Sequence, residues 1–317
     1  MAVLRSRHCW PCGSRALLGT VAGVGATDVV SVRAGSLASA FLVDDGSHGF
    51  ILGGLVEGSQ SILATRATRA NGVTTLNRVI LRRTPALPDS SVVPVLDFGS
   101  AESFAPAVAN VNIGGANGDG LSMNTMLITK NRRSILSVRT NDVNAIARTY
   151  DAIPASKLAA SDLQTLTAAA VDAANNSTRV ASISFHTPVD QTLTLGPPIE
   201  GPVISFAAPT AALQLRGTFA EQSAYDRLAQ MTFQQGANTV VSLSMTAAYA
   251  RLTGAFDLRL PDFTGVSGFD PRWVIHRNEQ VFWRAARSGG SLGAGVNPLP
   301  FDGATTRYAA TSGTFTP

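Results

Sequence analysis

Cysteine is nearly absent from this chain of 317 residues, and long hydrophobic runs are missing from it. The two cysteines, Cys9 and Cys12, both lie within the first dozen residues, so no disulfide can form within the rest of the chain. No run of about 18 apolar residues occurs, which excludes an ordinary membrane-spanning helix. Because chains without disulfides occur in either redox compartment, cysteine usage does not locate the protein.

Lysine is also scarce, although the formal net charge is +4. Lys130 and Lys157 are the only lysines, and the arginines are spread along the chain, with their densest clusters at 82–83 and 132–133. A nucleic-acid footprint needs a basic stripe, usually with interleaved aromatic side chains. The distribution therefore predicts no nucleic-acid partner.

The clearest strand pattern runs from Thr239 to Tyr249, where every second residue is apolar and the residues between them include hydroxyls. The apolar set is Val241, Leu243, Met245, Ala247 and Tyr249. A period of two places alternate side chains on opposite faces of a pleated strand. The pattern predicts one strand whose apolar set faces a core.

Short strands of the same kind are predicted along the whole chain, separated by turns rich in glycine and proline. Segments 273–275 and 281–283 form a predicted hairpin with its turn at Asn278-Glu279. Segment 155–174 is helix-like by propensity, but 163–171 also permits a strand, and in an all-β context we predict a strand. The other predicted strands span 17–21, 28–33, 49–55, 61–66, 74–82, 92–98, 107–113, 122–129, 134–139, 179–185, 191–195, 211–216, 225–233, 256–260 and 305–310. The predicted fold class is all-β, with three consecutive small antiparallel β-sandwich modules.

The first block carries a pattern of turn glycines and core apolar residues. It consists of Gly19-Thr20-Val21, Asp28 to Val32, Gly49-Phe-Ile-Leu-Gly-Gly-Leu55, Glu57-Gly58 and Ser61 to Arg66. Over roughly residues 16–83 this pattern resembles the carboxypeptidase regulatory-like, transthyretin-like β-sandwich modules of bacterial surface and periplasmic proteins. The resemblance implies an accessory role in folding or adhesion, and it supplies no catalytic residue.

A linker with three prolines, 196–202, interrupts any regular element and marks the clearest boundary. Residues 203–289 resemble a fibronectin type III-like or related immunoglobulin-like sandwich in strand spacing and aromatic placement. We predict a disordered or processed extension at 1–15, a carboxypeptidase regulatory-like sandwich at 16–100 and a second sandwich at 101–198. A fibronectin type III-like sandwich with a C-terminal tail is predicted at 199–317.

The N-terminus permits two interpretations. Arginines followed by the apolar segment 16–26 resemble a secretion signal, with Val24 and Ala26 as the small residues before the cut. Glycines interrupt that segment, however, and 17–21 and 28–33 also read as the first two strands. We prefer the strands, because the residues that follow complete the pattern of the first block.

Two motifs carry a possible chemistry. Cys9 and Cys12 form a Cys-x-x-Cys pair beside His8, which suits redox or zinc chemistry, but the strand and helix of a thioredoxin context are absent. Residues 289–293 match the Gly-x-Ser-x-Gly nucleophile elbow around Ser291. An elbow needs a following helix and a downstream histidine, and all four histidines precede Ser291. We interpret 289–293 as a glycine loop.

Other polar clusters fit turns better than sites. Asp44, Asp45 and His48 could bind a cation through oxygen ligands, and Asn112, Asn117 and Asp119 make a similar case, but both sequences are typical of turns between strands. His186 with Asp190 and His276 have no evident further partner. Trp273 and Trp283 could stack on a sugar, although alternation with apolar residues favours a core position for one of them.

The sequence therefore predicts no catalytic residue, no cofactor site and no metal site. We expect a non-catalytic binding, adhesion or scaffold protein of the bacterial cell envelope, located outside the cytoplasm, with a polysaccharide or another envelope protein as its partner. The alternative is a hydrolase acting on carbohydrate or ester, with a site assembled from separate loops such as those of Asp44, Asp45, His48 and Ser291. Sites assembled in this way leave no local motif.

Overall fold

The computed structural model describes most of the chain. The described residues are 15–35, 38–41, 48–70, 73–86, 88–129, 135–143, 147–207, 213–237, 239–253, 255–263, 266–270, 274–292 and 299–317. Nearly all the regular structure in these ranges is β-strand, so the predicted all-β class is confirmed. Antiparallel pairing dominates, as expected for short strands joined by short connections.

The first unit is a sandwich of two sheets. Its strands are β1 (Arg15–Ala22), β2 (Asp28–Ala34), β3 (Ala38–Phe41), β4 (Gly49–Leu55), β5 (Ser59–Ala70), β6 (Val73–Ala86), β7 (Ser91–Val92) and β8 (Leu96–Asp97). One sheet has the order β4-β1-β7, with β8 also paired to β1, and the other has the order β3-β2-β5-β6. Apolar residues between the two sheets, among them Val32, Leu52 and Ile80, form one buried cluster. The predicted strands 17–21 and 28–33 are thus confirmed as β1 and β2.

The rest of the chain forms a second and a third unit. The second has β9 (Ala107–Gly114), β10 (Gly120–Ile128), β11 (Ile135–Val143), β12 (Ala147–Ala152), the 3-10 turn η2 (Ala155–Lys157), β13 (Leu163–Asp172), β14 (Ser177–Phe185) and β15 (Gln191–Thr194). The third has β16 (Val203–Ala207), β17 (Gln214–Phe219), the 3-10 turn η3 (Ser223–Tyr225), β18 (Leu228–Gln235), β19 (Thr239–Thr246), α1 (Ala247–Thr253), β20 (Phe256–Arg259), β21 (Val281–Gly290) and β22 (Thr305–Phe315). The strand predicted over 163–171 is confirmed as β13.

Strand pairing repeats through the three units. The shared pattern starts with the central strand of a small sheet (β1, β9 or β17), and we call this small sheet the cover sheet of the unit. A hairpin of the other sheet follows (β2-β3, β10-β11 or β18-β19), and the next strand returns to pair with the first (β4, β12 or β20). The last two strands of the pattern then extend the hairpin sheet (β5-β6, β13-β14 or β21-β22). These six strands therefore follow the same order in all three units. The remaining cover strand differs, because β7 and β15 come last and run parallel to the central strand, whereas β16 comes first and runs antiparallel to it.

Equivalent positions also share their burial. Ala64, Ala168 and Ala285 occupy the same place in β5, β13 and β21, and each is fully buried. Each pairs with a buried core residue of the preceding strand in its sheet, namely Val32, Met123 or Met231. A small side chain at the centre of a close-packed sandwich leaves room for the larger residues around it.

The second and third units share one sheet. Its order is β11-β10-β13-β14-β22-β21-β18-β19, and we call this eight-stranded sheet the long sheet. The C-terminal strand β22 lies between β14 and β21, antiparallel to both. The predicted boundary at 198/199 therefore falls between strands that are hydrogen-bonded in one sheet, and independent folding on its two sides stays a prediction.

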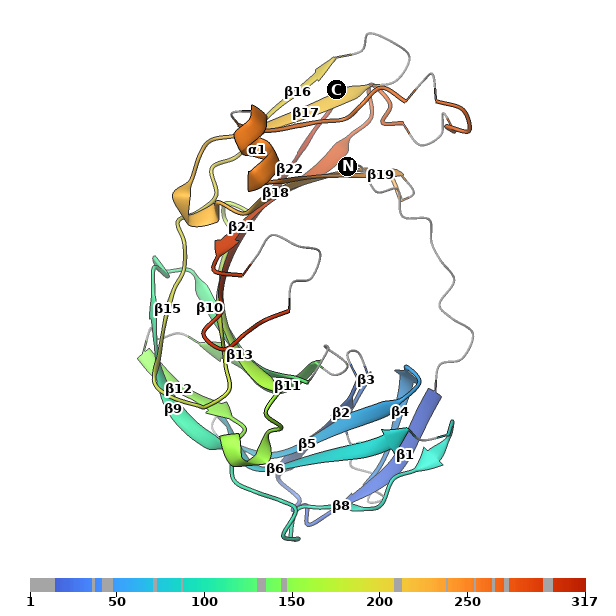
Figure 1. Cartoon of the computed structure of the whole chain (residues 1–317), viewed down its shortest axis with the longest axis vertical. Coiled ribbons are helices and arrows are strands. Elements are labelled where there is room, and N and C mark those ends of the chain that lie inside the picture. Colours follow the sequence, from blue (N-terminus) through green and yellow to red (C-terminus); the bar gives the residue numbers. More distant parts are fainter. Residues whose placement is uncertain are drawn as a thin grey trace.

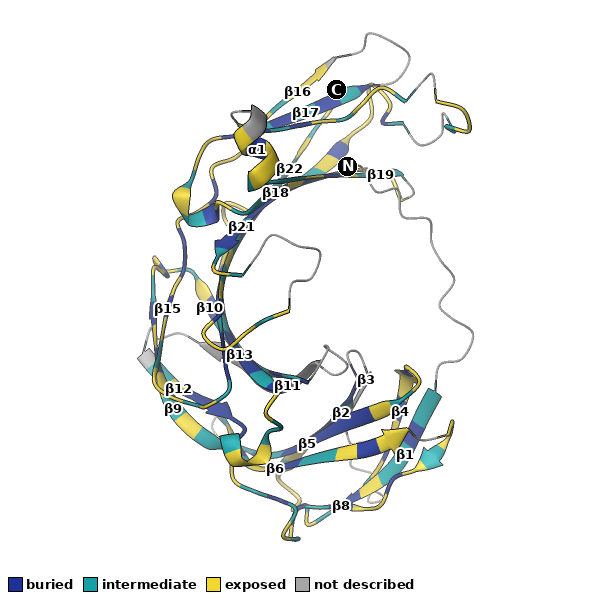
Figure 2. Cartoon of the chain, in the orientation of Figure 1, coloured by how far each residue is buried: buried dark blue, intermediate teal, exposed yellow. Residues whose placement is uncertain are grey.

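The units follow an arc (Figure 1). Cover strands β9, β12 and β15 lie on the outer side of the arc, and long-sheet strands β10, β13 and β21 lie on its inner side (Figure 1). Buried and exposed positions alternate along the strands (Figure 2). A further apolar cluster joins the first unit to the second through residues such as Leu63, Val79, Leu127 and Ile153.

The strand predicted over 239–249 is right in parity but too long. Leu243 is buried and Ser244 is exposed, as predicted, whereas Tyr249 is 57% exposed. Strand β19 ends at Thr246, and α1 takes the remaining residues. The Tyr249 backbone N–H points toward Thr246 Oγ1 at 3.4 Å, in the manner of a helix N-cap. Alanine-rich sequence after a capping threonine thus overrides the period-two pattern.

The hairpin predicted around Asn278 is wrong in its first strand, 273–275, whereas its second strand, 281–283, lies within β21. Val274 and Ile275 are not in a strand, and Trp273 is outside the described residues. The Gln235 side chain instead bonds the backbone of His276, accepting from its N–H at 2.8 Å and donating to its carbonyl at 2.9 Å. Those bonds replace the ladder that a partner strand would have formed. Asn278 does lie in a turn, at φ 62°.

Candidate functional sites

The sequence-predicted candidates are only partly described. His8, Cys9, Cys12, Asp44, Asp45 and Trp273 lie outside the described residues. Within the described part, no group of three or more His, Cys, Asp or Glu side chains is placed to hold a metal ion. No helix in that part is long and apolar enough to cross a membrane.

Ser291 lies in a structural position at the end of β21. Its hydroxyl accepts from the Thr305 backbone N–H at 2.8 Å and lies 3.3 Å from Thr305 Oγ1. A Cβ on Gly289 would lie 2.2 Å from the backbone oxygen of Ala224, and Gly290 has φ +112°. These glycines are therefore required by close backbone approach, a reason for the Gly-Gly-Ser sequence that is independent of catalysis.

The described histidines make backbone contacts. The His48 carbonyl accepts from the Val21 N–H at 3.0 Å, and His48 itself has φ 49°. His186 Nδ1 lies 3.0 Å from the carbonyl oxygen of Asp162. A carboxylate oxygen of Asp302 accepts from the His186 backbone N–H rather than from its ring. None of these contacts resembles a base held by an acid.

Asp119, predicted as part of a turn, is an ion-pair partner of a buried arginine. Arg179 Nη2 lies 2.6 Å from Asp119 Oδ2, and the Arg179 side chain is 2% exposed. Asn117, in the same turn, has φ 56°, which is typical of a tight turn. The turn interpretation therefore holds, and the carboxylate has a structural partner.

Asp190, which immediately precedes β15, is hydrogen-bonded to Asn110 of β9. Its Oδ1 accepts from the backbone N–H of Asn110 at 2.8 Å, and both carboxylate oxygens lie 3.1 Å from Asn110 Nδ2. These bonds to the charged form lower the pKa of Asp190. Trp283 packs against the core of the third unit, in line with its predicted core position.

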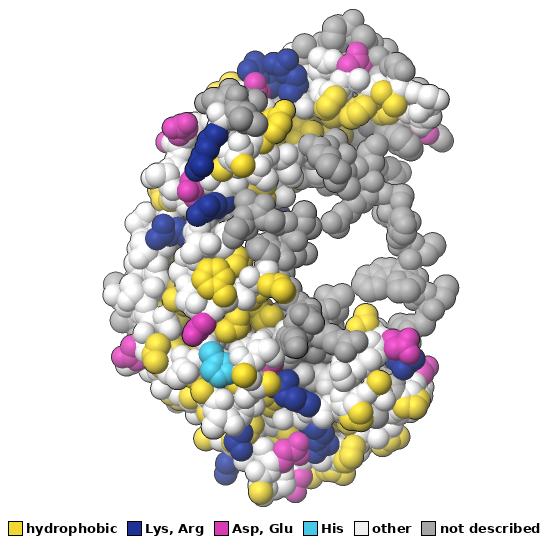
Figure 3. Space-filling view, in the orientation of Figure 1, with side chains coloured by type: hydrophobic (Ala, Val, Ile, Leu, Met, Phe, Trp, Pro, Cys, Tyr) yellow, Lys and Arg dark blue, Asp and Glu magenta, His cyan; other side chains and the backbone are white. Residues whose placement is uncertain are grey.

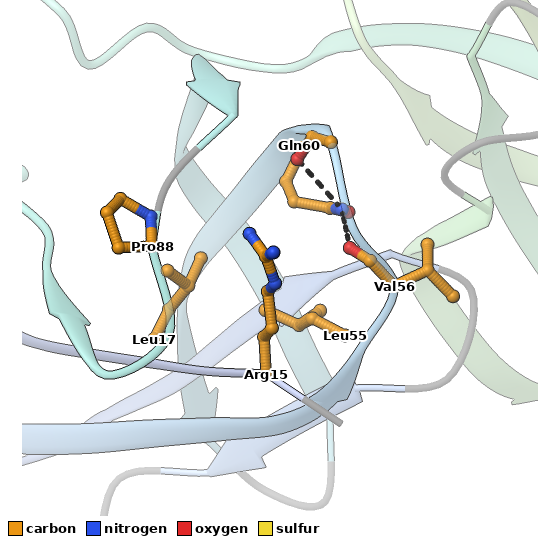
Figure 4. Close-up of a pocket in the computed structure, with 7 residues that line it drawn as sticks. Arg15, Leu17, Leu55, Val56, Gln60 and Pro88 are labelled. Carbon is orange, nitrogen blue, oxygen red and sulfur yellow. Dashed lines mark hydrogen bonds between the residues drawn. The ribbon is translucent and has the colours of Figure 1, made fainter. Parts of the chain in front are cut away.

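One shallow depression lies on the first unit, between the start of β1 and the β4-β5 turn (Figure 4). Arg15, Leu17, Val56 and Gln60 are among its lining residues. Gln60 Nε2 donates to the Val56 carbonyl at 2.7 Å and so fastens the turn. The side chain thus has a structural role, and the depression brings no acid, base or nucleophile together.

Sequence analysis missed a polar surface, the side of the long sheet that faces away from the cover sheets. We call it the open face. Cross-strand pairs of hydroxyl and amide groups run over it, namely Ser182 with Thr306, Thr232 with Ser242 and Gln230 with Ser244, and one further pair, Thr165 with Ser184, is buried. Alternating Ser and Thr in β13, β14 and β19 were the available signal. Only the pairing of β14 with β22 shows that these strands build one surface.

Charge does not gather on the surface that Figure 3 shows. Lys and Arg side chains are interspersed with Asp and Glu over the whole arc (Figure 3). Several cations are paired within the structure, for example Arg82 with Glu102 and Arg216 with Asp257. A dispersed charge of this kind does not form the basic stripe of a nucleic-acid interface.

Comparison with known proteins adds no relative. The chain matches no protein-family model, and its sequence matches none of the curated proteins.

Proposed function

We propose that the protein is a non-catalytic binding, adhesion or scaffold component of the bacterial cell envelope. The observation that carries this proposal is the open face, which extends across strands of two units and carries cross-strand pairs of hydroxyl and amide groups. Enzyme sites are usually concave pockets with a few converging polar groups. A broad sheet face suits the binding of an extended partner instead.

The repeated topology supports the same function. Six strands follow the same order in each of the three units, and the second and third units continue one another in the long sheet. Repetition of this kind produces extended surfaces and spacing rather than a single catalytic cleft. The resemblance of residues 16–83 to carboxypeptidase regulatory-like modules and of 203–289 to fibronectin type III-like modules supports an accessory role outside the cytoplasm.

The alternative hydrolase finds no specific support. Its proposed nucleophile, Ser291, is engaged with Thr305, and the glycines before it are explained by packing. His48 contributes a backbone contact to the fold of the first unit. We therefore argue for binding and treat turnover as an outcome of the test.

The test is a pull-down with insoluble cell-envelope fractions and insoluble polysaccharides, combined with turnover assays on chromogenic esters and glycosides. We expect the full chain to sediment with at least one envelope fraction and to hydrolyse none of the substrates above the buffer rate. Ser291→Ala should behave as the wild type in both assays. Turnover that is lost in Ser291→Ala, or the absence of any sedimentation, would contradict the proposal.

A further inference from the structure

We infer that the open face in the third unit binds a neutral polysaccharide chain. This inference rests on the proposed binding function and names the partner and the surface. The strands concerned are β22, β21, β18 and β19, which lie side by side in the long sheet. Their side chains on the open face include Tyr308, Ser312, Thr314, Phe282, Arg284, Gln230, Thr232, Gln234, Ser242 and Ser244.

The chemistry of this surface selects an uncharged, hydroxyl-rich partner. Arg284 is the only charged side chain that these four strands place on the open face. A polyanion would need several cations along its length, and a polycation would need carboxylates. Hydroxyl and amide groups can donate and accept hydrogen bonds at once, as sugar hydroxyls do.

The polar groups are arranged in rows but remain available. Thr232 Oγ1 lies 3.3 Å from Ser242 Oγ, and Gln230 Nε2 lies 3.3 Å from Ser244 Oγ. Contacts of this length are weak, and each hydroxyl keeps further donor or acceptor capacity. Ser242, Ser244 and Gln230 are all exposed. A ligand can therefore bond to them without breaking strong internal bonds.

Two aromatic rings supply the apolar contact that sugar rings require. Tyr308 is half-buried, and its hydroxyl accepts from Arg284 Nη2 at 3.1 Å, which fixes the ring position. Phe282 is 43% exposed and lies opposite Thr314, six residues along β22 from Tyr308. At about 3.4 Å per residue the two rings are roughly 20 Å apart, a span that fits an oligosaccharide rather than a single sugar.

The first unit provides an internal comparison. The corresponding side of its β3-β2-β5-β6 sheet carries Leu63, Ala67, Leu76 and Val79, and it packs against the second unit. Where this side of the repeat contacts protein, its residues are apolar. The same side in the third unit is rich in hydroxyls and amides, which argues for a hydrated ligand and against a dry protein interface.

The experiment is native affinity electrophoresis of the full chain in gels that contain soluble neutral polysaccharides, namely laminarin, hydroxyethylcellulose, glycogen or galactomannan. A gel with anionic alginate is run beside them. We expect at least one neutral polysaccharide to retard the wild type. Tyr308→Ala and Arg284→Ala should each weaken that affinity about tenfold, because a ring contact or a charged hydrogen-bond donor is lost.

Matched controls lie elsewhere on the third unit. Tyr249→Ala removes an exposed ring from α1, and Arg259→Ala removes an exposed cation from the cover sheet, so both should bind as the wild type. Circular dichroism checks that every variant is folded, and Arg284, being exposed, serves if Tyr308→Ala is unstable. Equal loss in the controls, retardation only by alginate, or no retardation at all would overturn the inference. If the wild type sediments with envelope fractions and the open-face variants sediment equally, the proposed function stands and this surface is excluded.

Discussion

Arg66 and Arg287 occupy the same position in two different units. Arg66 pairs with Val30 across β5 and β2, and Arg287 pairs with Ala229 across β21 and β18. Each guanidinium donates to the carbonyl of the first residue after the unit's central cover strand, which is Gly23 or Ala220. The arginine thus ties the loop between the two sheets to the larger sheet.

The second unit obtains the same contact from the adjacent strand. Ala170 stands at the equivalent position of β13, and its partner on β14 is Arg179. Arg179 Nη1 donates to the carbonyl of Gly115, the first residue after β9, at 2.7 Å. The same contact therefore occurs in all three units, with the arginine on β5, β14 or β21. Arg179 and Arg287 are buried and Arg66 is partly buried, which favours a structural role for these cations.

We expect Arg179→Met to destabilise the protein by about 3–5 kcal/mol, because removal of one partner of a buried pair leaves the other without compensation. Arg179 also bonds the carbonyls of Ala116 and Gly196, which would lose their donor. Chemical denaturation measures the change. Arg307→Met, at an exposed arginine of β22, is the matched control and should cost less than about 1 kcal/mol. Equal costs would show that burial of Arg179 has no energetic importance.

The parity of β19 predicts opposite results for neighbouring residues. Leu243 is buried in the core of the third unit, so Leu243→Ala should cost about 2–5 kcal/mol. Ser244 is exposed on the open face, so Ser244→Ala should stay within about 0.5 kcal/mol. Urea unfolding of the two variants checks the prediction. Similar losses would mean that the strand assignment is wrong.

Gly289→Ala should destabilise the third unit by about 1–3 kcal/mol through overpacking. The added Cβ would meet the backbone oxygen of Ala224 at 2.2 Å, and a backbone atom cannot rotate away. Gly53→Ala is the control, because a Cβ there meets no atom within 4 Å. Thermal unfolding compares the two. A neutral Gly289→Ala would show that the approach of η3 to β21 is looser than the structure has it.

The sequence was sufficient for local features of this fold. Alternation over 239–249 predicted both the strand and the face that is buried, because a shift of one residue would bury the hydroxyls and expose the apolar side chains. The strand over 163–171 was predicted from the all-β context of the chain. The helix α1 was missed because alanine suits both a helix and an alternating strand. A capping contact at the start of α1 runs from the Tyr249 N–H to Thr246 Oγ1 at 3.4 Å, and a contact of one side-chain oxygen leaves no pattern in the sequence.

The pairing of strands that lie far apart in the chain could not be predicted from the sequence. Nothing local to Thr305–Phe315 indicates that β22 inserts beside β14, which is more than a hundred residues earlier in the chain. The open face depends on that pairing. The sequence therefore shows the Ser and Thr residues, but it does not predict that they lie on one surface. Motifs that were visible, such as that around Ser291, proved to have packing explanations.

Acid should weaken the third unit through Asp257. The Arg216 guanidinium donates to both oxygens of this carboxylate, at 2.7 and 2.8 Å, and so lowers the pKa of Asp257. A lowered pKa in the folded state means that the stabilisation is present above the ordinary carboxyl pKa of about 3.9 and is lost as pH falls through the folded value. Asp257→Asn should therefore be less stable than the wild type at about pH 7, and the difference should shrink as the pH falls below the ordinary carboxyl pKa. Urea midpoints measured at neutral and at acid pH test this, and a difference independent of pH would contradict it.

Cleavage of the proline-rich linker should leave the two halves of the chain together. The protease site is inserted between Gly201 and Pro202. A Cβ added to Gly201 would meet no atom within 4 Å, so this point of the linker has open space around it and the insertion should not disturb the fold. Across the cut, β14 and β22 stay paired from Ser177 with Thr311 to Ile183 with Thr305. The Tyr225 hydroxyl also holds the Pro197 carbonyl at 2.6 Å.

We therefore expect the cleaved fragments to co-elute in size-exclusion chromatography and to separate only in denaturant, because separation would expose two long strand edges to solvent. The matched control carries the same inserted site within 299–303. Cleavage there produces a short fragment that contains only β22, and only the strand pairing of β22 should hold this fragment to the rest of the chain. Fragments that separate under native conditions would show instead that the boundary at 198/199 divides independently folding units. In that case the pairing of β14 with β22 would contribute little to holding the second and third units in one sheet.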